Sequence, residues 1–146
     1  MTLQYPLEER FLVLAPTGRD AALTCSLLER AGLSAATVST LAEMCETFGE
    51  HGSAALLIAE EIFARDGLEP LTHMLSKQSS WSDIPIVIFT GNAASARPRS
   101  RSPQDLLAVG NVILMERPLQ PVSMLSAARS ALRARRRQYE ARADIL

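Results

Sequence analysis

The sequence predicts an open α/β fold in which one doubly wound parallel sheet of five strands is covered by helices on both faces. Five short apolar runs alternate with stretches of helical periodicity along the 146 residues. Three of these runs are continuously apolar, which is typical of strands buried on both faces of a parallel sheet. They are Phe11-Leu12-Val13-Leu14, Leu56-Leu57-Ile58 and Ile86-Val87-Ile88-Phe89. The length suits one domain that buries its own core.

The predicted strands cover residues 11–15, 35–38, 54–59, 84–90 and 111–115. Between the first four strands, apolar residues recur at helical spacing, and these stripes are Leu23-Leu27-Leu28, Leu41-Met44-Cys45-Phe48 and Leu68-Leu71-Leu75. Gly32 and Gly49 are the expected left-handed ends of the first two helices. Ser39 or Thr40 is expected to cap the start of the second helix, with Glu43 completing a capping box.

The connection between the fourth and fifth strands departs from the regular pattern. Residues 92–103 are rich in Ala, Ser, Arg and Pro, and Pro98 and Pro103 block helix propagation. The fourth helix is therefore expected to be short, over residues 104–109, and to follow a mobile loop.

The last segment predicts a helix that outlasts the domain. A core-facing stripe of Val122, Leu125, Ala128 and Leu132 is followed by a run rich in arginine. We therefore predict a domain over residues 8–132 and a C-terminal helix extension, a signalling or linker helix, over residues 133–146. Leu125, Leu132, Tyr139 and Leu146 recur every seven residues, a weak coiled-coil seam. The chain ends on apolar residues, which suggests a piece of a larger protein.

Composition excludes several classes of function. The net charge of −1 gives no general attraction to nucleic acid or membranes. Cys25 and Cys45 belong to no CxxC or Cys/His cluster, so they indicate a reducing compartment. No signal peptide or membrane-spanning run is present, and we expect a cytoplasmic protein. The sequence contains no phosphate-binding glycine motif or HExxH motif, so it predicts no enzyme with its own substrate.

Two motifs then carry a family resemblance. The fourth predicted strand and its end, residues 84–91, read Ile-Pro-Ile-Val-Ile-Phe-Thr-Gly, and residues 117–119 after the fifth strand read Arg-Pro-Leu. Together with the order of elements, they resemble response-regulator receiver domains, and residues 11–32 align with the chemotaxis receiver without a gap. The resemblance implies a flavodoxin-like receiver fold, and the N-terminal receiver of a sensor histidine kinase is one expected setting.

The resemblance also implies a degenerate phosphorylation site. In receivers, an acidic pair after the first strand and an Asp after the third hold Mg²⁺, and that Asp accepts a phosphoryl group. Here the acidic pair falls on Ala15 and Pro16, and the acceptor position falls on Glu60. The phosphoryl-contacting Lys falls on Arg117, and only Thr90 is unchanged. We therefore expect a pseudo-receiver with no metal site, no cofactor and no catalytic residue.

We further expect Glu60 to be a fixed negative charge that pairs with Arg117 and locks the domain in one state. Glu61 competes for the same role because the alignment is uncertain by one residue. The family's bond before the position of Pro118 is cis, which would turn Arg117 inward; an ordinary trans turn is the alternative.

These residues predict a module of a two-component pathway that acts by protein contact. The expected partner is a histidine kinase or another signalling protein. A homodimer through the fourth-helix and fifth-helix face and the C-terminal helix is a further option. One alternative is a phosphorylatable receiver with an atypical site. Another is the receiver-like half of a nucleic-acid-binding regulator or antiterminator, for which the basic residues of 133–142 are the only support.

Overall fold

A computed structural model describes residues 6–91 and 110–145 of the chain. The strands are β1 (Phe11–Leu14), β2 (Ala35–Thr37), β3 (Ala55–Ala59), β4 (Pro85–Thr90) and β5 (Asn111–Glu116). The helices are η1 (Leu7–Glu9, 3₁₀), α1 (Gly18–Arg30), α2 (Leu41–His51), α3 (Glu61–Asp66), α4 (Glu69–Ser76) and α5 (Pro121–Ile145). The short helix expected over residues 104–109 lies outside the described residues, so α4 here belongs to the connection between β3 and β4.

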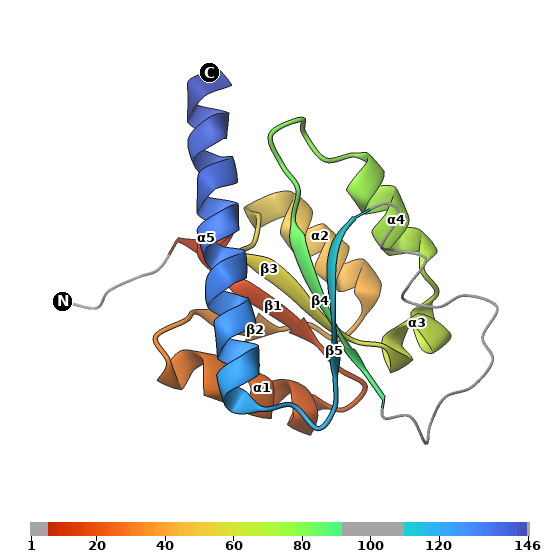
Figure 1. Ribbon diagram of the computed structural model, residues 1–146. Coiled ribbons are helices and arrows are strands. Elements are labelled where there is room, and N and C mark those ends of the chain that lie inside the picture. Colours follow the sequence, from red (N-terminus) through yellow and green to blue (C-terminus); the bar gives the residue numbers. More distant parts are fainter. Residues whose placement is uncertain (1–5, 92–109, 146) are drawn as a thin grey trace.

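The five strands form one parallel sheet in the order β2-β1-β3-β4-β5, as the sequence predicts (Figure 1). The strand order reverses between β1 and β3, because the chain first moves outward to β2 and then returns to the other side of β1. In such sheets the carboxyl ends of the strands beside this reversal form the usual binding crevice.

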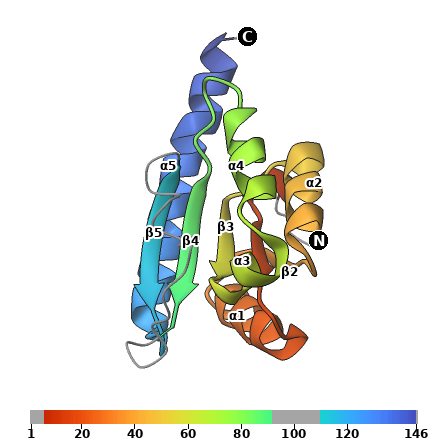
Figure 2. The same cartoon turned by 90° about the vertical axis from the view of Figure 1, so that its right-hand side faces the viewer.

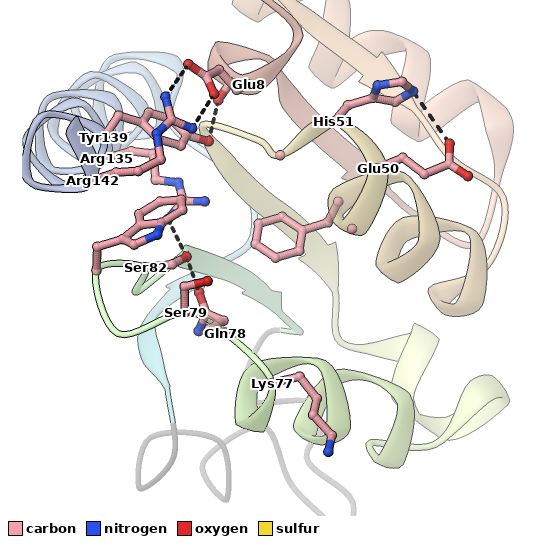
Figure 3. Close-up of a pocket in the computed structure, with 14 residues that line it drawn as sticks. Glu8, Glu50, His51, Lys77, Gln78, Ser79, Ser82, Arg135, Tyr139 and Arg142 are labelled. Atoms are coloured by element: carbon pink, nitrogen blue, oxygen red, sulfur yellow. Dashed lines mark hydrogen bonds and ion pairs between the residues drawn. The ribbon is translucent and has the colours of Figure 1, made fainter. Parts of the chain in front are cut away.

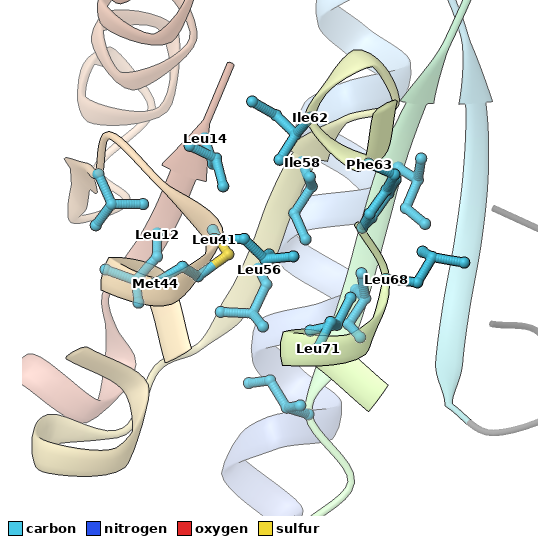
Figure 4. Close-up of a cluster of buried hydrophobic side chains, with 14 of the residues drawn as sticks. Leu12, Leu14, Leu41, Met44, Leu56, Ile58, Ile62, Phe63, Leu68 and Leu71 are labelled. Atoms are coloured by element: carbon cyan, nitrogen blue, oxygen red, sulfur yellow. The ribbon is translucent and has the colours of Figure 1, made fainter. Parts of the chain in front are cut away.

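Two apolar cores cover the two faces of the sheet. Alternate side chains of β1 and β3 point to opposite faces, so Leu12 and Leu56 join one core, whereas Val13 and Leu57 join the other. Helices α2, α3 and α4 close the first core, which Figure 4 shows. Helices α1 and α5 close the second, and Figure 2 views the layers from the side. All residues of β1 and β3 are buried, which explains their uninterrupted apolar sequence.

The helix ends confirm one capping prediction and correct another. The Thr40 hydroxyl caps α2 by accepting a hydrogen bond from the Glu43 N–H (3.0 Å), and the Glu43 carboxylate accepts one from the Ser39 N–H (2.8 Å). Gly49, the expected end of α2, instead lies within the helix, which runs on to His51. The left-handed residue is Gly52 (φ 71°), where an added Cβ would lie 3.0 Å from the Tyr139 hydroxyl oxygen.

The second half of α5 packs against the body of the domain. Within the predicted extension, Arg135 and Tyr139 are only 1% and 9% exposed. Leu132 and Tyr139, two members of the hypothetical coiled-coil seam, are thus buried by contacts within the chain. The boundary at residue 132 stays a prediction. In the described parts of the chain, no helix is long and apolar enough to cross a bilayer.

Leu56→Ala is expected to lower the free energy of unfolding by about 2–5 kcal/mol, because Leu56 is fully buried on the central strand and its truncation leaves a cavity. Leu23→Ala is the matched control, because Leu23 is 61% exposed on α1, and it should change stability by less than about 0.5 kcal/mol. Urea denaturation followed by circular dichroism measures both. Equal effects of the two substitutions would contradict the assignment of the core.

Candidate functional site

The residues singled out by the sequence meet at the carboxyl-end edge of the sheet. Ala15 and Pro16 follow β1, Glu60 follows β3, Thr90 is the last residue of β4, and Arg117 follows β5. Beside them, a mostly apolar pocket of about 440 Å³ lies between α1, the strand ends and the start of α5. Arg117 and both residues at the acidic-pair positions line this pocket. The sheet topology therefore brings the candidate site residues together at one edge. The role of each residue stays a prediction.

Arg117 forms a bidentate ion pair with Glu61. The sequence favoured Glu60 as the partner of Arg117 and left Glu61 as the alternative. Both terminal nitrogens of the guanidinium donate to the Glu61 carboxylate, one of them over 2.9 Å. The guanidinium Nε and the backbone N–H of Arg117 both donate to the carbonyl oxygen of Thr90, over 3.1 and 3.0 Å. These bonds join the ends of β4 and β5 to the first turn of α3.

The electrostatics of this edge favour the charged guanidinium. The hydrogen bonds that Arg117 donates to the Glu61 carboxylate raise the pKa of Arg117 above its ordinary value, and partial burial opposes that rise. The negative charges of Glu61, Glu60 and Asp20 add to it. Arg117 is thus a permanent cation at this edge of the sheet. The Arg117–Pro118 peptide bond is cis, as the resemblance implies.

Glu60 bridges two strand ends by itself. Its backbone N–H donates to the Phe89 carbonyl oxygen (3.0 Å), and its side-chain Oε1 accepts a hydrogen bond from the Gly91 N–H (2.7 Å). The residue stands immediately before α3, in a helical conformation. A carboxylate that accepts a backbone N–H ties the loop after β4 to the end of β3. Glu60 is therefore a positioned acceptor at this edge of the sheet.

Two of the positions that supply metal ligands in receivers carry no side-chain oxygen here. Mg²⁺ takes an octahedral cage of oxygen ligands. Ala15 and Pro16 carry no side-chain oxygen, and the Glu61 carboxylate is paired with a guanidinium. Within residues 6–91 and 110–145, no group of three or more His, Cys, Asp and Glu side chains is placed to hold a metal ion. The residues present thus do not reproduce the metal-binding set of receivers.

A cluster at the opposite edge of the sheet was not predicted from the sequence. There Arg135, Tyr139 and Arg142 of α5 surround Trp81, whose ring centroid lies 5.6 Å from that of Tyr139. Trp81 therefore packs against α5 at the end of the sheet where the strands begin. The available signal was the i, i+4, i+7 spacing of the three α5 residues, which places them on one helix face. Among the remaining arginines of the basic run, Arg136 pairs with Glu9.

No protein-family profile and no curated protein sequence matches the chain. Solved structures do match it. A CheY-like response regulator receiver domain from Methylobacillus flagellatus is 15% identical, with a TM-score of 0.64, over 84% of this chain and 98% of that one. The pseudo-receiver domain of CikA is 16% identical, with a TM-score of 0.62, over 84% and 96%.

A third match comes from a complex of two Saccharomyces cerevisiae proteins, the histidine phosphotransfer protein Ypd1 and the receiver domain of Ssk1. It is 14% identical, with a TM-score of 0.61, over 83% of this chain and 86% of that one. At these identities the likeness concerns the fold. The chain has the five-stranded fold of response-regulator receiver domains, and a pseudo-receiver is among its structural neighbours.

The Arg117–Glu61 pair is expected to show a coupling free energy of about 0.2–1 kcal/mol, because both side chains are about one-third exposed and water weakens their attraction. A double-mutant cycle with Arg117→Gln and Glu61→Gln, measured by urea denaturation, gives this quantity. The coupling should fall in high salt. Glu60→Gln is the matched control, and a larger coupling of Arg117 to Glu60 than to Glu61 would contradict the assigned pairing.

Proposed function

We propose that this chain is a signalling module of a two-component pathway that acts by protein contact and does not transfer phosphoryl groups. The carrying observation is the closed Arg117–Glu61 pair beside Ala15 and Pro16, at the edge where the receiver fold places its phosphorylation site. The fold, shared with receiver and pseudo-receiver domains, supports the signalling role.

The loss of phosphoryl transfer follows from charge. A phosphodonor brings negative charge to the strand ends, and receivers neutralise it with a metal ion and a Lys. Glu60, Glu61 and Asp20 all lie close enough to Arg117 for their negative charges to act on it, and Glu61 already takes up the guanidinium in an ion pair. Without the oxygen ligands of an acidic pair, no metal ion is held to reverse that sign. Mg²⁺ binding is proposed to be lost for the same reason.

The proposed partner is a histidine kinase or another signalling protein. The receiver domain of Ssk1, which has the same fold, is in complex with a histidine phosphotransfer protein. The face for homodimer formation that the sequence favoured includes residues 104–109, which lie outside the described residues. The alternative nucleic-acid role loses support, because Arg135 is buried and both Arg136 and Arg142 are paired with glutamates.

Incubation with Mg²⁺ and acetyl phosphate or phosphoramidate should leave the intact mass of the protein unchanged, because the metal ligands and the acceptor Asp are missing. Intact-mass spectrometry measures the adduct, and a phosphorylatable receiver treated in parallel is the positive control. A stable phosphoryl adduct on the parent chain would sink the proposed function and favour a phosphorylatable receiver with an atypical site.

Restoring the acidic residues should restore the chemistry. The triple variant Ala15→Asp, Pro16→Asp, Glu60→Asp is expected to gain a Mg²⁺-dependent phosphoryl adduct, because it rebuilds an oxygen cage at the strand ends. Glu60→Asp alone is the matched control and should gain none. If the triple variant folds and binds Mg²⁺ but stays unmodified, the missing carboxylates do not account for the lost activity.

A further inference from the structure

A second pocket lies at the opposite end of the sheet, where the strands begin. It has a volume of about 380 Å³ and is formed by the end of α2, the connection between α4 and β4, and the second half of α5 (Figure 3). Phe48, Trp81 and Tyr139 give it aromatic walls, and Arg135 and Lys77 supply cationic groups. Nothing in the proposed signalling role uses this pocket, and the inference below does not depend on that role.

Arg135 is a buried cation with no carboxylate partner. The residue is 1% exposed, and its hydrogen bonds to the described residues all go to neutral oxygens. Its Nε donates to the carbonyl of Ser53 (3.0 Å), and its Nη1 donates to the Ser82 hydroxyl (2.8 Å) and to the Gln138 side chain (2.7 Å). Among the described residues, no carboxylate lies within ion-pair distance of it. Burial accordingly lowers the pKa of the guanidinium.

Aromatic rings offset only part of this charge. The guanidinium carbon of Arg135 lies 4.5 Å from the ring centroid of Tyr139, 5.4 Å from that of Trp81 and 5.6 Å from that of Phe48. The negative faces of such rings attract a cation but carry no net charge. A buried ion is stabilised much more by an opposite charge in good geometry. The pocket is thus lined by a buried cation whose charge a bound anion would neutralise.

The other charges of the pocket leave its interior positive. Arg142 is neutralised by Glu8, with which it forms an ion pair of 2.8 Å. At the rim, the exposed Lys77 and Glu50 have opposite signs, and water screens both. The C-terminal end of α2 adds a partial negative charge of about half an elementary charge, which is less than the full charge on Arg135. The buried guanidinium therefore decides which ligands the pocket attracts.

We propose that this pocket binds a small aromatic carboxylate. The carboxylate is the counter-ion of Arg135 and accepts a hydrogen bond from Nη2, the one guanidinium nitrogen that makes no hydrogen bond to the described residues. The aromatic ring packs against Phe48 and Trp81, which are both half-buried and line the same space. The volume lies within the range of about 300–1,000 Å³ that small-molecule sites occupy.

The chain carries its own reporter, because Trp81 is its only tryptophan and lines the pocket. Titration with benzoate should change its fluorescence saturably, with a Kd of about 1 mM or lower. Benzyl alcohol has the same ring without the charge, and acetate has the charge without the ring. Both should bind at least tenfold more weakly than benzoate. The absence of a saturable change, or equal binding of benzoate and benzyl alcohol, overturns the proposal without any variant.

Two variants locate the site. Arg135→Gln should abolish benzoate binding and leave the weak binding of benzyl alcohol unchanged. Phe48→Leu changes a half-buried ring at the pocket wall and tests the site even if the first variant does not fold; it should weaken benzoate severalfold. Arg133→Gln, two residues before Arg135 and on an exposed part of α5, is the matched control and should bind like the parent. Unchanged benzoate affinity in Phe48→Leu, or in a folded Arg135→Gln variant, places any binding elsewhere and overturns the proposal.

Discussion

The burial of the central strands on both faces is the constraint that organises this molecule. Every residue of β1 and β3 is buried, and five of the six residues of β4 are buried as well. Polar groups in such strands cannot be placed on either face, because each face is covered by helices and an apolar core. Chemistry is therefore confined to the two edges where the strands end or begin.

The two edges satisfy their charges in different ways. At the carboxyl ends, Glu61 forms an ion pair with Arg117, and both side chains are partly exposed to water. At the other edge, Arg135 is withdrawn from water and is held by neutral oxygens and aromatic rings. The first arrangement lies at the edge where the receiver fold places its phosphorylation site. The second leaves a charge open to a ligand.

The strands could be predicted from the sequence because continuous apolar runs have few other solutions in a chain of this length. The positions at the strand ends followed from them, since parallel strands bring those ends to one edge. The choice between Glu60 and Glu61 could not be predicted, because it depends on which way each side chain leaves the first turn of α3. The end of α2 at Gly52 was missed because an exposed glycine such as Gly49 is tolerated within a helix.

The buried role of Arg135 was also beyond prediction. An arginine in a run of arginines indicates a solvated face, and only tertiary contacts show that this one faces Trp81 and Ser53. The same applies to Tyr139, whose hydroxyl donates either to the Glu8 carbonyl (2.8 Å) or to that of Ser53 (2.9 Å). Periodicity identifies the helix but not the partner elements at its far end.

These contacts fix α5 to the domain at two separate places. The helix has 25 residues, which corresponds to a length of about 37 Å, and it is anchored near both ends of the sheet. Met124 is buried close to its start, and Tyr139 is buried four turns further on. Because α5 is held at both of these points, it cannot rotate about either one. A displacement at the strand ends that moves the start of α5 would therefore be transmitted along the helix and would load the contacts of Tyr139 and Arg142 with Glu8 of η1.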